Sequence, residues 1–178
     1  PLSMDRRQFI TTIAAAIPAL ACPRLALANP DPVRQLVFEH THTGERLAVE
    51  YAQGDAYLPD ALASVNHLLR DFRTGDVCAI DTDLLDLLHG LAELTETSRP
   101  FQVISGYRSP ATNAMLRQRR EGVAGGSLHM LGKAIDIRLA DVPLAQLRRA
   151  ALSAGRGGVG FYPASNFVHV DTGRVRWW

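Results

Sequence analysis

The sequence has little net charge and almost no lysine. Its 19 basic and 18 acidic residues leave a formal charge of +1, and Lys133 is the only lysine. A charge this close to zero gives no electrostatic reason to expect nucleic acid or an anionic lipid surface as a partner. The fractions of 47% hydrophobic and 21% charged residues are ordinary for a globular protein. The 178 residues are enough for one domain with its own core.

Cysteine is scarce as well, with Cys22 and Cys78 the only two. Cys22 lies in an N-terminal segment that we expect to be removed, so that Cys78 is left alone and no internal disulfide can form. We interpret Cys78 as a small buried residue rather than as a nucleophile.

Long apolar runs are missing too. Residues 13–21 are apolar but are interrupted by Pro18, and this run is too short to span a membrane. It follows the pair Arg6 and Arg7, and residues 26–28 read Ala-Leu-Ala, the small-residue pattern of a cleavage site. We therefore expect residues 1–28 to be a vector remnant followed by a twin-arginine signal peptide. Residues 29–178 would then be a single periplasmic domain, monomeric and without stable membrane insertion.

Periodicity along residues 29–178 predicts alternating strands and helices. Residues 34–40 and 45–52 alternate in polarity around a Thr-Gly turn, which is typical of a hairpin. We expect His40 and His42, beside this turn, to be solvated. The other predicted elements are helices over 58–72, 81–95 and 143–154, a helix opening at Ser109-Pro110, and strands over 101–106, 159–161 and 167–171. We expect an α+β fold, with a small antiparallel sheet, helices packed on one face and a metal site on the other.

The candidate site comes from residues 127–136, Ser-Leu-His-Met-Leu-Gly-Lys-Ala-Ile-Asp, and from Asn166 to Asp171 near the C-terminus. Side chains alternate between the two faces over residues 134–139 and 168–171, with the larger apolar ones on one face, as in half-buried strands. Asp136 and His169 would both point away from the core, and His129 would join them from the preceding loop. Two histidines and a carboxylate are a common ligand set for a catalytic zinc, which keeps a further position open. The alternative is three unrelated hydrogen-bonding residues, but Asp is depleted in strand interiors, and this favours the metal.

The pattern Ser-x-His-x-x-Gly-x-Ala-x-Asp, followed by a late His, resembles that of the zinc D-Ala-D-Ala peptidases of bacterial cell walls. The resemblance extends to residues 66–73, 105–110 and 167–173 and is strongest to the murein endopeptidase K-like branch. It implies a Hedgehog-like fold and zinc bound by His129, Asp136 and His169. It also implies peptidoglycan stem peptides as partners and hydrolysis of their peptide crosslinks.

Three further residues receive roles within this resemblance. Arg108 could anchor a substrate carboxylate bidentately, or it could be a surface residue that stabilises its own loop. Ser127 could bind substrate or fix its loop. Related carboxypeptidases place an acid a few residues before the last His, but residues 163–167 contain none. Asp171 is therefore either the general base or, the interpretation we favour, a residue that orients a ligand.

Two other functions remain open on the sequence alone. Because no acid precedes His169, the protein could be a zinc-bearing module that binds peptidoglycan without cutting it. The other is an exported structural domain without metal.

Overall fold

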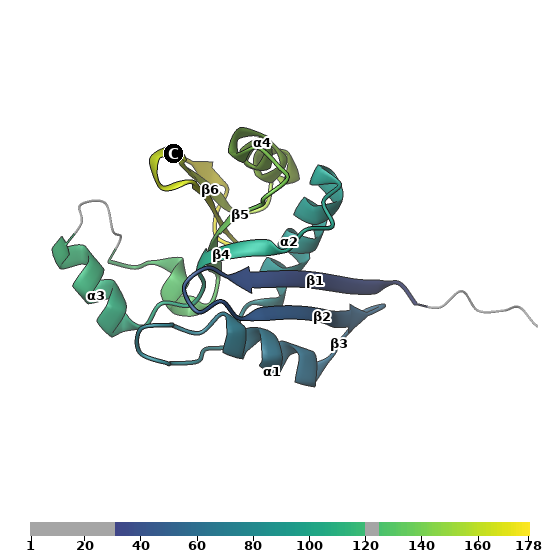
Figure 1. Ribbon diagram of the computed structural model, residues 1–178, viewed down its shortest axis with the longest axis horizontal. Helices are drawn as coiled ribbons and strands as arrows, with labels where there is room; N and C mark the ends of the chain where they lie inside the picture. The colour runs from purple at the N-terminus through teal and green to yellow at the C-terminus, as the bar shows by residue number, and fades with distance from the viewer. Residues whose placement is uncertain (1–30, 120–124) are drawn as a thin grey trace, which may run out of the picture. The chain divides into compact units, whose positions relative to one another are not determined.

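The computed structural model describes residues 31–119 and 125–178. One eight-stranded sheet runs through this part of the chain, in the order β3-β2-β1-β4-β5-β7-β6-β8 (Figure 1). The strands are β1 (Val33–His40), β2 (Arg46–Gln53), β3 (Ala56–Tyr57), β4 (Phe101–Ser105), β5 (Ala134–Arg138), β6 (Gly158–Tyr162), β7 (Phe167–Asp171) and β8 (Arg176–Trp177). The expected leader, residues 1–28, lies outside the described residues.

The sheet is mixed, so the expectation of a small antiparallel sheet was wrong. The hairpin of β1 and β2 is confirmed, and β4, β5, β7 and β6 also pair antiparallel. However, β1 pairs with β4 in parallel, and β6 pairs with β8 in parallel. Two helices separate β1 and β2 from β4, a connection long enough to return the chain beside β1 in the same direction. The turn after β7 likewise reverses the chain, which then crosses to the far side of β6.

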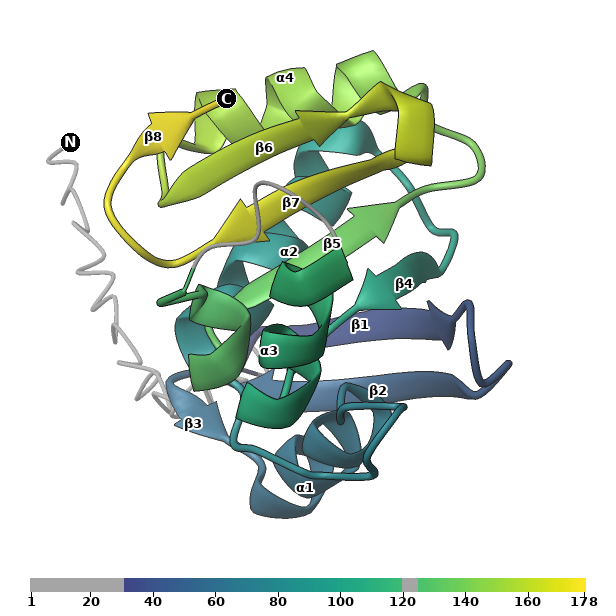
Figure 2. The same ribbon diagram turned by 90° about the vertical axis from the view of Figure 1, so that its left-hand side faces the viewer.

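Helices lie on both faces of the sheet, which corrects the expectation that they share one face. The described residues form α1 (Pro59–Leu68), α2 (Thr82–Thr95), α3 (Pro110–Arg119) and α4 (Leu144–Ala154). In Figure 2, α3 lies in front of the sheet while α2 and α4 lie behind it. None of these helices combines the length and apolar character that crossing a membrane would require.

Local signals in the sequence place the ends of two helices correctly. The Asp81 carboxylate accepts a hydrogen bond of 3.1 Å from the backbone N–H of Asp83 and so caps α2. The Ser109 hydroxyl accepts one of 3.2 Å from the N–H of Thr112 at the start of α3. By contrast, α1 ends at Leu68 rather than at residue 72.

The core fills the space between the sheet and the α2–α4 layer. Ile135 and Ile137 of β5 and Val168 of β7 are fully buried in it. The alternate residues of β5 and β7 therefore face the side of the sheet on which α3 lies. His40 is also fully buried, against the edge of the Phe72 ring, so the expectation that it is solvated was wrong.

Candidate metal centre

Three side chains converge on the α3 side of the sheet. Asp136 and His169 are direct neighbours across β5 and β7, and His129 reaches them from a short 3-10 helix, η1 (Leu128–Leu131). His129 Nε2 lies 3.2 Å from His169 Nδ1 and 3.4 Å from Asp136 Oδ1. Asp136 Oδ1 lies 2.9 Å from His169 Nδ1. All three residues are more than 90% buried, at 3%, 6% and 8% exposure.

Backbone contacts fix the position of His129. Gly132 ends η1 at a φ of 66°, and a Cβ there would collide with the carbonyl of Ala79. Glycine is therefore required for the turn that joins η1 to β5. On its other side, the carbonyl of His129 accepts a hydrogen bond of 3.1 Å from the N–H of Arg108. The motif glycine thus sets the spacing between His129 and Asp136.

Hydrogen bonds behind the two imidazoles decide which nitrogen atoms are free. His129 Nδ1 lies 2.8 Å from the carbonyl oxygen of Gly106, which can only accept, so Nδ1 carries the proton. His169 Nε2 lies 3.0 Å from Asp171 Oδ2 and donates to it. The lone pairs of His129 Nε2 and His169 Nδ1 then point together toward Asp136. A protonated outer nitrogen and a free inner one are typical of metal-binding histidines, so the donor set fits zinc.

Asp171 lies behind the site and is completely buried. Besides His169, it accepts hydrogen bonds of 2.9 Å from the N–H groups of Gly158 and Gly173. Arg176 donates to both of its oxygens, at 3.1 and 2.7 Å. With five donors on one carboxylate, the Asp171 side chain has one orientation available.

Charge in the site follows from these contacts. Burial opposes ionisation of Asp136, but the facing His129 and His169 outweigh it and hold the pKa of Asp136 well below its usual range. Burial is also the largest influence on Asp171, and the hydrogen bonds from His169 and Arg176 overcome it and lower its pKa. Burial disfavours a charged His169, yet the two carboxylates prevail and raise the pKa of this imidazole.

Arg108 reaches the same site from the loop after β4. One of its terminal nitrogens lies 3.7 Å from Asp136 Oδ2, and its buried Nε has no hydrogen-bond partner within the described part of the chain. Burial lowers the pKa of Arg108 most, Asp136 raises it, and the positive charge of Arg73 lowers it further. Ser127 precedes η1, and its hydroxyl does not cap that helix. Both residues line the cavity above the three candidate ligands.

This cavity has a volume of about 660 Å³. Its floor holds His129, Asp136 and His169, and Asp136 is the one carboxylate among the described residues that line it. Tyr162 and Trp178 form one wall, with the Trp178 Nε1–H donating to the Tyr162 hydroxyl at 2.7 Å. Asp171 does not line the cavity. The arrangement can hold a metal ion at the bottom of a groove large enough for a peptide.

Known proteins are similar in sequence to this chain over nearly its whole length. A family model described as peptidoglycan L,D-endopeptidase MepK matches residues 28–178. The peptidoglycan L,D-endopeptidase MepK of Escherichia coli is 43% identical over 177 residues, which cover 98% of this chain and 97% of the relative. The probable peptidoglycan L,D-endopeptidase MepK of Haemophilus influenzae is 42% identical over 180 residues, covering 99% and 97%. This chain belongs to the MepK family.

The resemblance inferred from the motifs is thereby confirmed, and the matched range includes every candidate site residue of this MepK-family chain. Sequence reasoning missed Arg176, Tyr162 and Trp178. One signal was available for two of them, because Arg176 and Trp178 are two residues apart and alternate to the same side of a strand. These two side chains reach the site, however, only because β8 pairs with β6.

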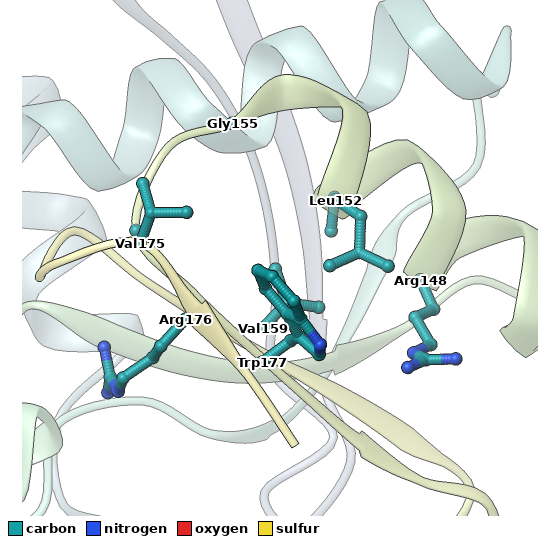
Figure 3. Close-up of a pocket in the computed structure, with 9 residues that line it drawn as sticks. Arg148, Leu152, Gly155, Val159, Val175, Arg176 and Trp177 are labelled. Carbon is teal, nitrogen blue, oxygen red and sulfur yellow. The ribbon is translucent and has the colours of Figure 1, made fainter.

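A second cavity, of about 300 Å³, lies between α4 and β8 of this MepK-family chain (Figure 3). Leu152, Val159 and Trp177 form its apolar centre, with Arg148 and Arg176 on opposite sides. Arg176 lines both cavities and so forms part of the wall between them.

Proposed function

We propose that this chain is a zinc-dependent peptidoglycan L,D-endopeptidase that hydrolyses peptide crosslinks of the bacterial cell wall. The observation that carries the proposal is the buried His129, Asp136 and His169 cluster, whose ligand atoms lie within 4.8 Å of one another at the floor of a large cavity. Family membership supplies the reaction and the substrate class, since the relatives are named for this activity.

Zinc would be held by His129 Nε2, His169 Nδ1 and a carboxylate oxygen of Asp136. When bound, the metal supplies a Lewis acid and lowers the pKa of a water molecule to about 7. The chain's own residues do the rest: the Gly106 carbonyl and Asp171 hold the imidazole protons away from the site. The apolar core beneath β5 and β7 keeps that arrangement rigid.

Arg108 binds the substrate in this proposal. An L,D crosslink joins the carbonyl of an L-centre to the amine of a D-centre, and a carboxylate on that D-centre stands next to the bond to be cut. A guanidinium can bind such a carboxylate through two parallel hydrogen bonds. A terminal nitrogen of Arg108 lies 3.7 Å from Asp136 Oδ2, and its Nε has no partner in the described part of the chain, so the guanidinium has donors left at that place. Ser127, at the cavity wall, contacts the substrate backbone.

Asp171 orients His169 rather than acting as the base. Each of its oxygens is already occupied by donors, it is fully buried, and it lies outside the cavity. A general base must be within hydrogen-bond reach of the proton that it takes, directly or through one water.

A second candidate function is a zinc-bearing module that binds peptidoglycan without cutting it. The observation that favours it is that, among the described residues lining the cavity, no carboxylate other than Asp136 is present. Binding without turnover would then use the same floor and the same Arg108.

The deciding experiment incubates the purified protein with crosslinked muropeptide dimers and follows the products by mass spectrometry. We expect dimers to become monomers, and a chelator to stop the reaction until zinc is restored. Retention of dimers without cleavage would favour the binding module. His129→Ala and Asp136→Ala should each release zinc at moderate chelator concentration, whereas full zinc occupancy in both variants would contradict the site.

We further propose that residues 29–178 form a single mature domain, monomeric and located in the periplasm, where its substrate lies. Residues 1–28 would serve only for export, through the twin-arginine route.

A further inference from the structure

The cavity contains a second guanidinium besides that of Arg108. Arg73 and His42 line the same cavity as Arg108 and the three candidate ligands. The Arg73 guanidinium carbon lies 4.1 Å from the centre of the Phe72 ring. The His42 ring stacks with Phe72 at 4.2 Å between centroids and an angle of 12° between planes. These aromatic contacts hold the long Arg73 side chain beside the cavity.

Arg73 differs from several other arginines of the described chain because no acidic side chain pairs with it. Arg70 pairs with Glu45, Arg34 with Asp86 and Arg176 with Asp171. Within the described ranges, the Arg73 side chain has neither a carboxylate nor a hydrogen-bond acceptor as partner. Its guanidinium instead lies over the ring of Phe72. An exposed guanidinium on a cavity wall is therefore available to an anion from outside.

One carboxylate ties the two arginine loops together. The two oxygens of Asp71, which is 1% exposed, accept hydrogen bonds of 3.0 Å from the N–H of Arg73 and 2.9 Å from the N–H of Ser109, next to Arg108. Asp71 is thereby occupied by backbone donors. It therefore holds together the backbones of the two loops that carry Arg73 and Arg108.

Two positive side chains that line one cavity repel each other, and an anion between them would relieve this repulsion. Burial lowers the pKa of Arg108 most and Asp136 raises it, while the positive charge of Arg73 lowers it by a smaller amount. The Asp136 carboxylate, 3.7 Å from Arg108, offsets this repulsion for Arg108 but does not pair with Arg73. A ligand carrying two carboxylates would neutralise both guanidiniums at once.

We propose that Arg73, supported by Phe72 and His42, is a second carboxylate subsite, which binds a free carboxylate of the peptidoglycan stem other than the one that Arg108 holds. The inference rests on the proposed function and extends it to the substrate class. Crosslinked stems carry several free carboxylates, so a substrate lying along the cavity presents a second one. The subsite would make the protein selective for stems whose carboxylates are free rather than amidated.

The test compares Arg73→Gln with the wild type on two crosslinked dimers. One dimer has free stem carboxylates. In the other they are amidated, except for the carboxylate next to the scissile bond. We expect Arg73→Gln to raise KM about 10-fold on the free dimer with little change in kcat, as the loss of one charge-assisted contact implies. On the amidated dimer, the variant and the wild type should be alike.

Two controls separate the subsite from a general loss of charge or structure. Arg99→Gln removes the same charge from an exposed arginine outside the cavity, at the opposite end of β4, and should leave both KM values unchanged. Arg73→Lys keeps the charge but loses the planar fork, and its KM should be intermediate. Zinc content and Tm should be the same in all variants.

Binding measurements keep this inference distinct from the proposed function. Calorimetry gives the affinity of the full chain for each dimer under chelator, where no cleavage is expected. The wild type should prefer the free dimer and Arg73→Gln should not, even if the protein proves unable to cut either one. Equal preference in both proteins would overturn the subsite, while absent turnover alone would overturn only the hydrolase.

Discussion

Asp171 is the residue that holds His169 in place in the candidate metal centre. It receives the outer proton of His169 and is itself held by Arg176 and by two backbone N–H groups. The imidazole therefore presents Nδ1 to the site in a fixed direction. Groups that orient a metal ligand in this way typically contribute a factor of about 10 to 100 in metal affinity.

Asp171→Asn should therefore lower zinc affinity about 10- to 100-fold, because the amide holds the imidazole less well than the carboxylate. Activity should return when zinc is added in excess. The measurement is a zinc titration against a competing chelator, with activity followed in parallel. Asp55→Asn, an exposed substitution away from the site, is the control and should bind zinc as the wild type does. If saturated Asp171→Asn stays inactive, Asp171 is the base instead.

At the scale of the elements, hydrogen bonds to Asp71 connect the segment after α1 with the start of α3. Its carboxylate accepts hydrogen bonds from the N–H groups of Arg73 and Ser109. Burial opposes its ionisation most, but hydrogen bonds from Thr112, Ser109 and Arg73 together lower its pKa below the ordinary 3.8. A carboxyl whose folded pKa is lowered stabilises the protein above its unfolded pKa and ceases to do so as the pH falls through the folded value.

Asp71→Asn should thus be less stable than the wild type by about 1–3 kcal/mol at pH 7, since buried hydrogen bonds to a charged group are lost. The difference should shrink as the pH falls below about 4 and the wild-type carboxylate becomes protonated. Denaturant unfolding at a series of pH values measures it, again with Asp55→Asn as control. A difference independent of pH would mean that Asp71 acts through packing and not through its charge.

For the whole molecule, the mixed sheet places the first strand, β1, inside the sheet and the last strand, β8, at one edge. At that edge, Arg176 of β8 and the following Trp178 both line the cavity of the candidate metal centre. The described residues that line the cavity all lie after residue 28, within the domain that we expect to remain after export. We therefore expect export and hydrolysis to be separable.

Replacing Arg6 and Arg7 together by Lys should trap the precursor in the cytoplasm, because the twin-arginine receptor reads that pair. Fractionation followed by immunoblotting measures the precursor. Arg24→Lys, in the same leader but away from the pair, should be exported normally. Normal export of the double variant would indicate the general secretory route.

Local periodicity determined much of this fold from the sequence. The β1–β2 hairpin, the Asp81 and Ser109 caps, and the alternation that puts Asp136 and His169 on one face all depend on residues close together in the chain. The candidate ligand set could be named for the same reason. Side-chain direction in a strand follows from its period of two, whatever the strand's neighbours are.

Only the tertiary structure decided which strands lie side by side and which groups hydrogen-bond to the candidate ligands. The parallel pairs β1–β4 and β6–β8, and the place of α3 opposite α2 and α4, depend on how long connections return to the sheet. The burial of His40 and the position of Arg73 in the cavity of Arg108 follow from that packing. Of the donors on Asp171, His169 and Gly173 are only two residues away along the chain, so they are local. The N–H of Gly158 reaches Asp171 only because β6 pairs with β7, and no local pattern could place that donor, since the pairing joins segments that the sheet alone makes neighbours.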